Sequence, residues 1–91
     1  MSTELKEVEQ ILKALANRRR ITIIRLLNHH AVLSVGDIAE KIKITFTATS
    51  NHLAILRAAD IVEREQVSLT MNYRLVHPLH PLTKIVASDK A

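Results

Sequence analysis

The 91-residue chain suits one domain, and 47% of its residues are apolar, which is enough to fold around a small core. It contains no cysteine, which excludes disulfides, zinc–thiolate sites and cysteine nucleophiles. No stretch is long and apolar enough to cross a membrane, and the first residues lack the pattern of a secretion signal. We therefore expect a cytoplasmic protein with no membrane partner.

Positive charge is concentrated in the middle of the sequence. Residues 13–59 carry eight basic and two acidic side chains, whereas the rest of the chain carries five basic and seven acidic ones. A basic region between less basic flanks is what binding to a polyanion such as double-stranded DNA requires. Only Phe46 and Tyr73 are aromatic, which disfavours a protein that stacks the bases of RNA or single-stranded DNA.

Four helices are predicted before residue 60, in a region with one glycine and no proline. Apolar residues at helical spacing predict a first helix over about 3–16 and a second over about 18–28. Ser34 and Thr45 are good N-terminal caps, for a third helix and for a fourth over about 46–58.

The pattern changes after Asp60. Residues 61–65 and 71–75 alternate between apolar and polar side chains, which predicts a two-stranded β-hairpin with its tip at 67–70. Pro81 suits the first turn of a last helix, over about 79–88. The fold class is therefore mainly α (α+β): a winged helix-turn-helix domain in which the hairpin is the wing.

Several stretches of the sequence resemble the ArsR/SmtB family of bacterial and archaeal repressors. The similarity runs from about residue 12 to 76, and its most specific part is residues 44–57, with Ser50, His52, Leu53 and Leu56. The resemblance implies that residues 1–91 form one DNA-binding domain and that the fourth helix enters the major groove. It also implies a homodimer held by the first and last helices, and repression that an inducer relieves.

The sequence departs from the metal sensors of that family. Residues 34–36 replace a Cys-Val-Cys site, and the last helix lacks the Asp and His pair of a second site, although His77 and His80 precede it. We therefore expect no metal ion and no cofactor, and the sequence identifies no inducer. Asp60 replaces the usual glycine after the fourth helix, where it would have to adopt a left-handed conformation.

The wing departs from the family pattern as well. Its expected tip, Val67-Ser68-Leu69-Thr70, lacks the usual glycine and arginine, and its first strand contains Glu63 and Glu65. These departures disfavour contact between this wing and DNA phosphates, and the sequence leaves that contact open.

Candidate DNA contacts are the polar, outward side chains of the fourth helix and the basic residues around it. If Thr49, Leu53 and Leu56 face the core, the outward side is mostly short and polar. Asparagine can bond adenine bidentately, hydroxyls can bond bases or phosphates, and lysine and arginine neutralise phosphates. The full set is Thr45, Thr47, Ala48, Ser50, Asn51, Lys41, Lys43, Arg57, Arg64 and Arg18.

Four other residues near this set have less specific interpretations. Arg19 and Arg20, beside Arg18, could bind phosphate or form a solvated face. Phe46 is expected to pack against the start of the fourth helix, and His52 to be a packed and hydrogen-bonded structural residue.

The outer helices carry more apolar side chains than a core of this size can absorb, which predicts a homodimer. The interface candidates are Leu5, Val8, Leu12, Leu82, Ile85 and Val86.

We predict no catalytic residue. The sequence has no phosphate-binding loop and no nucleophile elbow, and Ser50 and His52 lie two apart on a helix, so they point in different directions. Two non-enzymatic alternatives to a DNA-binding regulator stay open. The acidic wing favours a winged-helix module that docks another protein, and the scarcity of aromatic residues disfavours an RNA-binding winged helix.

Overall fold

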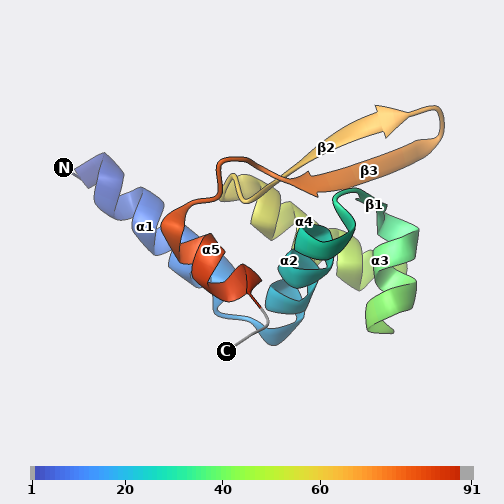
Figure 1. Cartoon of the computed structure of the whole chain (residues 1–91), viewed down its shortest axis with the longest axis horizontal. Helices are drawn as coiled ribbons and strands as arrows, with labels where there is room; N and C mark the ends of the chain where they lie inside the picture. The colour runs from blue at the N-terminus through green and yellow to red at the C-terminus, as the bar shows by residue number, and fades with distance from the viewer. Residues whose placement is uncertain (1, 89–91) are drawn as a thin grey trace.

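The computed structural model describes residues 2–88, and this part of the chain contains five helices and a three-stranded sheet (Figure 1). The elements in chain order are α1 (Ser2–Leu15), α2 (Arg18–His30), β1 (Leu33–Ser34), α3 (Val35–Ile42), α4 (Phe46–Ala58), β2 (Val62–Val67), β3 (Thr70–Leu75) and α5 (Pro81–Ala87). The predicted winged helix-turn-helix is confirmed. Helix α2 runs two residues further than expected, and α5 is shorter than the expected span of 79–88.

The wing is the antiparallel hairpin of β2 and β3, which projects from the helical body (Figure 1). Its register pairs Val62 with Leu75 at the base and Val67 with Thr70 at the tip. The short strand β1 adds to the other edge of β3 through Leu33 and Ser34, which makes the sheet order β1-β3-β2. The sequence analysis did not predict β1, because two residues are too few to show an alternating pattern.

The hydrophobic core lies between α2, α3, α4 and the base of the wing. Helix α2 is central because Ile23, Ile24 and Leu27 recur at helical spacing on one face, and all three are buried. Leu53 and Leu56 of α4 enter the same cluster, which also includes side chains of α1, α3, the base of the wing and α5. The core therefore fixes the inner face of α4 and leaves the opposite face free.

Glycine is the usual residue after the C-terminus of a helix, and this chain has only one. Side chains of neighbouring helices instead donate hydrogen bonds to the last carbonyl groups of two helices. Arg25 of α2 donates from Nε to the carbonyl oxygen of Val86 (2.9 Å), and Asn28 donates to that of Ala87 (3.5 Å), so α2 holds the end of α5. Gln10 of α1 donates to the carbonyl oxygen of Ala58 (3.0 Å) at the end of α4. These side chains satisfy carbonyl groups that a helix end leaves without partners.

Three residues at helix ends have a positive φ angle, and the first of them is Ala31 (φ 69°), the C-cap of α2. Lys43 (φ 60°) follows α3, and Asp60 (φ 58°) follows α4, as expected for a residue in the place of glycine. Within residues 2–88, no helix has both the length and the apolar character that a bilayer crossing requires.

Candidate nucleic-acid interface

The three residues between α3 and α4 set the angle of the helix-turn-helix. Lys43 adopts the left-handed conformation and donates its backbone N–H to the carbonyl oxygen of Ala39, which ends α3. Thr45 is extended, and its hydroxyl oxygen accepts a hydrogen bond from the N–H of Ala48 (3.1 Å), which starts α4. The predicted cap of α4 is confirmed, and with it the orientation of the helix's first turn.

The inner face of α4 is anchored by a buried threonine and two leucines. Thr49 is fully buried, and its hydroxyl donates to the carbonyl oxygen of Thr45 (2.9 Å). Leu53 and Leu56 are fully buried one and two turns later. This face matches the one predicted from the sequence, and it prevents α4 from rotating about its own axis.

The opposite face of α4 is exposed, and its N-terminal half is polar. At about 100° of rotation per residue, Thr47 and Asn51 point away from the buried face, and both are exposed. Ala48 and Ser50 lie on the two flanks and are half-buried. Further along, the same face carries Ala54, Ile55 and Ala58, which are small or apolar. Base-specific hydrogen bonds are therefore available only from the first two turns.

Phe46 does not pack against the start of α4 as predicted, since 61% of its surface is exposed. Phe46 is the first residue of α4, and helical side chains lean over the turn that precedes them, so no helical turn is present to cover this ring. An exposed ring at this point could touch a thymine methyl group in the groove.

Lys41, Lys43 and Arg18 are exposed and close to the helix-turn-helix. Asn17, Arg18, Arg19 and Thr22 at the start of α2 line an open hollow of about 550 Å³ together with Ile42, the last residue of α3. The start of α2 therefore adjoins the end of α3, where Lys41 and Lys43 are located, and Arg18 belongs to the same basic area.

Arg57 and Arg64 do not join this basic area. Arg57 is exposed near the C-terminal end of α4 and lies about 120° around the helix from Asn51. Arg64 is on the wing and donates from Nη1 to the hydroxyl of Tyr73 (3.4 Å). Both side chains are exposed, but Arg57 lies off the outward polar face of α4 and Arg64 belongs to the wing.

Arg20 is a structural residue that sequence analysis grouped with Arg18 and Arg19. It donates from Nε to the carbonyl oxygen of Ala14 (2.7 Å) and from Nη2 to that of Lys13 (3.2 Å). Its Nη1 lies 3.3 Å from Nδ1 of His52. The sequence contained a signal for this role, because Arg20 has helical spacing to Ile23, Ile24 and Leu27 and so lies on the inner side of α2.

His52 on α4 is the acceptor in this network. Partial burial, and then the positive charges of Arg20 and Arg19, lower its pKa from 6.5. The imidazole is therefore neutral at pH 7, so Nδ1 can accept a hydrogen bond from Arg20. The expected structural role of His52 agrees with this geometry, since it joins α4 to the end of α1 through one arginine.

The acidic residues of the wing are paired with a basic residue of the wing itself. Arg74 on β3 donates to Glu63 (2.9 Å) and lies 3.6 Å from Glu65. Glu63 accepts that hydrogen bond and raises the pKa of Arg74. Leu69 at the tip is 97% exposed. The wing therefore has an apolar tip and a group of charges that neutralise one another. Arg74 belongs to that group, so it is not free to bind phosphate.

His77 and His80 lie in the segment between β3 and α5. His80 is the N-cap of α5, and its Nδ1 accepts the backbone N–H of Leu82 (3.1 Å). In the described part of the chain, no three His, Asp or Glu side chains come together in a way that could hold a metal ion.

The dimer-interface candidates lie on two adjacent helices. Helices α1 and α5 lie side by side at one end of the molecule (Figure 1). Leu5 is 72% exposed, Ile85 71% and Leu12 49%, whereas Val8, Leu82 and Val86 are half-buried. In the single chain, each of these six side chains therefore keeps apolar surface in contact with water.

Taken together, a capped helix with a free polar face, a basic area next to it and a projecting hairpin define a winged helix-turn-helix DNA-binding protein. The family model described as "Bacterial regulatory protein, arsR family" matches residues 17–64, from the start of α2 into the wing. The chain belongs to the ArsR family and is a DNA-binding transcriptional regulator. A comparison with curated protein sequences gave no match.

Solved structures of regulators resemble the whole fold. HlyU from Vibrio vulnificus CMCP6 is 32% identical with a TM-score of 0.73, over 96% of this chain and 86% of that one. The repressor BigR from Xylella fastidiosa is 28% identical with a TM-score of 0.76, over 94% and 85%.

A homodimeric winged helix-turn-helix DNA-binding domain, Mb0332 from Mycobacterium bovis, is 28% identical with a TM-score of 0.83, over 94% of this chain and 77% of that one. It is described as a possible ArsR-family transcriptional regulator.

Proposed function

We propose that the protein is a cytoplasmic, homodimeric repressor and that residues 1–91 act as one DNA-binding domain. The observation that carries the proposal is the uncovered face of α4. Its first two turns present hydroxyl and amide groups, its inner face is fully anchored, and the basic area of α2 and α3 lies beside it. A rigid polar ridge next to positive charge has the shape and chemistry that a major groove requires.

The groups on this ridge would have different tasks. Asn51 is placed to bond an adenine edge, and Thr47 and Ser50 offer hydroxyls to bases or phosphates. Lys41, Lys43 and Arg18 would hold the flanking phosphates. Thr45 and Ala48, at the start of the helix, would bring the backbone close to the DNA. Arg57 and the wing residue Arg64 would contact phosphates outside the ridge.

The exposed apolar stripe of α1 and α5 supports the homodimer. Leu5, Leu12 and Ile85 are too exposed to stabilise a monomer, and burying them against a second copy would remove their surface from water. The homodimeric state given for Mb0332 supports a homodimer here as well. Two-fold symmetry would then place two α4 helices in half-sites about one helical turn, ~34 Å, apart.

Repression would follow from occupancy, because a dimer seated on a promoter blocks other proteins from the same DNA. The description of BigR as a transcriptional repressor supports this direction of regulation. The proposal needs no catalytic residue, metal ion or cofactor.

Lys43→Gly is expected to weaken binding to every duplex about threefold to tenfold and to reduce the slope of log affinity against log salt by about one. Glycine suits the left-handed conformation at this position, so the fold should not lose stability. Fluorescence anisotropy with labelled duplexes at several salt concentrations measures both quantities. Lys6→Ala, which removes an exposed lysine from α1, is the control and should leave both unchanged.

Asn51→Ala is expected to reduce the preference for one base pair of the operator by about 1–3 kcal/mol while leaving the other positions unchanged. The residue is exposed and takes no part in the core, so stability should change by less than about 0.5 kcal/mol. Competition between single-base operator variants measures the effect. An unchanged preference at every position would show that Asn51 does not read a base.

The surface of the wing gives some support to a second function, docking of another protein. A wing with an apolar tip at Leu69 and two acidic residues, Glu63 and Glu65, on its first strand resembles a protein contact more than a phosphate contact. This alternative predicts little DNA affinity even at low salt, and it predicts that Lys43→Gly has no effect on what affinity exists.

A further inference from the structure

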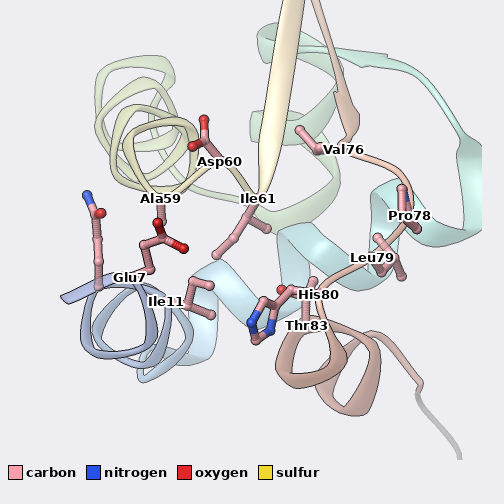
Figure 2. Close-up of a pocket in the computed structure, with 11 residues that line it drawn as sticks. Glu7, Ile11, Ala59, Asp60, Ile61, Val76, Pro78, Leu79, His80 and Thr83 are labelled. Carbon is pink, nitrogen blue, oxygen red and sulfur yellow. The ribbon is translucent and has the colours of Figure 1, made fainter. Parts of the chain in front are cut away.

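A cavity of about 330 Å³ lies at the junction of three parts of the fold. It is bounded by α1, by the residues that link α4 to β2, and by α5 with the segment before it (Figure 2). This volume is at the lower end of the range found for small-molecule sites. The cavity is on the α1–α5 side of the molecule, whereas the DNA-facing ridge is formed by the first two turns of α4.

A buried hydroxyl without a partner lines this cavity. Thr83 of α5 is only 2% exposed, and its Oγ1 makes no hydrogen bond to any described residue. A buried hydroxyl in this state costs free energy unless another molecule completes it. Among the described residues, the other buried side-chain polar atoms have hydrogen-bond partners. The unpaired hydroxyl of Thr83 therefore points to a ligand.

The walls and the charges define what that ligand would be. Apolar side chains, including Ile11, Ile61 and Leu79, form much of the lining. Glu7 and Asp60 are the acidic residues that line the cavity, and neither carboxylate has an ion-pair partner in residues 2–88. Figure 2 shows the carboxylate of Glu7 turned toward the middle of the cavity and Asp60 at its rim.

We propose that this cavity binds a small organic amine, with its apolar body against the walls, its ammonium group near Glu7 and a polar hydrogen on the hydroxyl of Thr83. No lysine or arginine lines the cavity, so its charge selects a cation over an anion. His80 uses Nδ1 to cap α5, which leaves the N–H of a neutral ring free on Nε2 for an oxygen of the ligand.

The location of the cavity connects such a ligand to DNA binding. Gln10 lines the cavity and also holds the last carbonyl group of α4, and Ala59 and Asp60 continue directly from that helix. An amine in the cavity would therefore contact α1, α5 and the end of α4 at once. The amine would then act as an effector that changes the affinity of the protein for DNA, and this role rests on the proposed function. Thermodynamic linkage requires that DNA changes the affinity for the amine by the same factor.

The test begins without DNA. Isothermal calorimetry on the full chain uses 2-phenylethylamine, phenylalkyl and alkyl amines of similar size, and for each amine the matched alcohol and carboxylate. We expect amines to bind and the carboxylates not to bind. Thr83→Val should weaken amine binding about twofold to tenfold, while the thermal stability of the free protein stays the same or rises because an unpaired hydroxyl is removed.

Two further variants locate the charge that recognises the amine. Glu7→Gln should weaken amine binding about twofold to fivefold, as expected for a partly solvated ion pair. Glu9→Gln is the control on the same helix, because Glu9 faces Lys13 at 3.9 Å and does not line the cavity. Absence of binding by every amine, or binding that Thr83→Val and Glu7→Gln leave unchanged, overturns the proposal. Absence of binding by every amine is the result expected if a second copy of the chain fills the cavity.

Anisotropy with labelled DNA then tests the effector role separately. We expect a saturating amine to change DNA affinity at least threefold, and no change would overturn the effector role. If the amine binds in calorimetry but the protein has no DNA affinity, the proposed function fails and the binding site stands.

Discussion

Ile85→Glu is expected to convert the protein to a monomer, raising the dimer dissociation constant about 100-fold or more, which corresponds to about 2.7 kcal/mol. The side chain is 71% exposed in one chain, so the fold tolerates a charge there, but the proposed interface would have to bury that charge without a partner. Equilibrium sedimentation at several protein concentrations measures the change.

The same substitution should remove tight binding to a two-half-site operator, because a monomer engages only one half-site. Leu69→Glu is the matched control, since Leu69 is also exposed but lies at the tip of the wing, away from α1 and α5. A wild-type protein that sediments as a monomer at micromolar concentration would contradict the proposed interface, and so would an Ile85→Glu variant that remains a dimer.

Arg20→Ala is expected to destabilise the fold by about 2 kcal/mol. The guanidinium group is part-buried and hydrogen-bonds two carbonyl groups at the end of α1 and the ring of His52 on α4, so its removal loosens the connection between these helices. Urea unfolding followed by circular dichroism measures the loss. Arg20→Lys should recover only part of it, because one ammonium group cannot reproduce the fork of donors.

Arg19→Ala is the control for stability, because Arg19 is exposed and should change it by less than about 0.5 kcal/mol. Loss of Arg20 should also let the pKa of His52 move up toward 6.5, which an NMR titration can follow. In the wild-type protein the pKa of His52 is lower in the folded state than in the unfolded state, so His52 takes up a proton when the protein unfolds between these two pKa values. The contribution of neutral His52 to stability is therefore present above pH 6.5 and is lost as the pH falls. Equal unfolding free energies for Arg20→Ala and Arg19→Ala would contradict the structural role of Arg20.

The order of the elements and the inner face of α4 could be predicted from the sequence because both depend on local chemistry. Thr45 and Ser34 cap helices through their own hydroxyls, and Thr49, Leu53 and Leu56 recur at helical spacing. The left-handed conformation of Asp60 followed from the glycine that it replaces in the resembling family.

The contacts that depend on distant parts of the chain were missed. Strand β1 exists only because β3 offers it an edge, and the role of Arg20 requires α1, α2 and α4 in their final places. The cavity at Thr83 has no sequence signal, because its lining comes from residues far apart in the chain. Phe46 was predicted to pack, but most of its surface is exposed, because no helical turn precedes it to cover the ring.

The central claim is that the outward face of α4 reads a DNA groove, and selection from a pool of random duplexes by the purified protein tests it most directly. The account predicts enrichment of a palindrome whose half-sites lie about one helical turn apart, at both low and moderate salt. Recovery of unenriched sequences at both salt concentrations would contradict it.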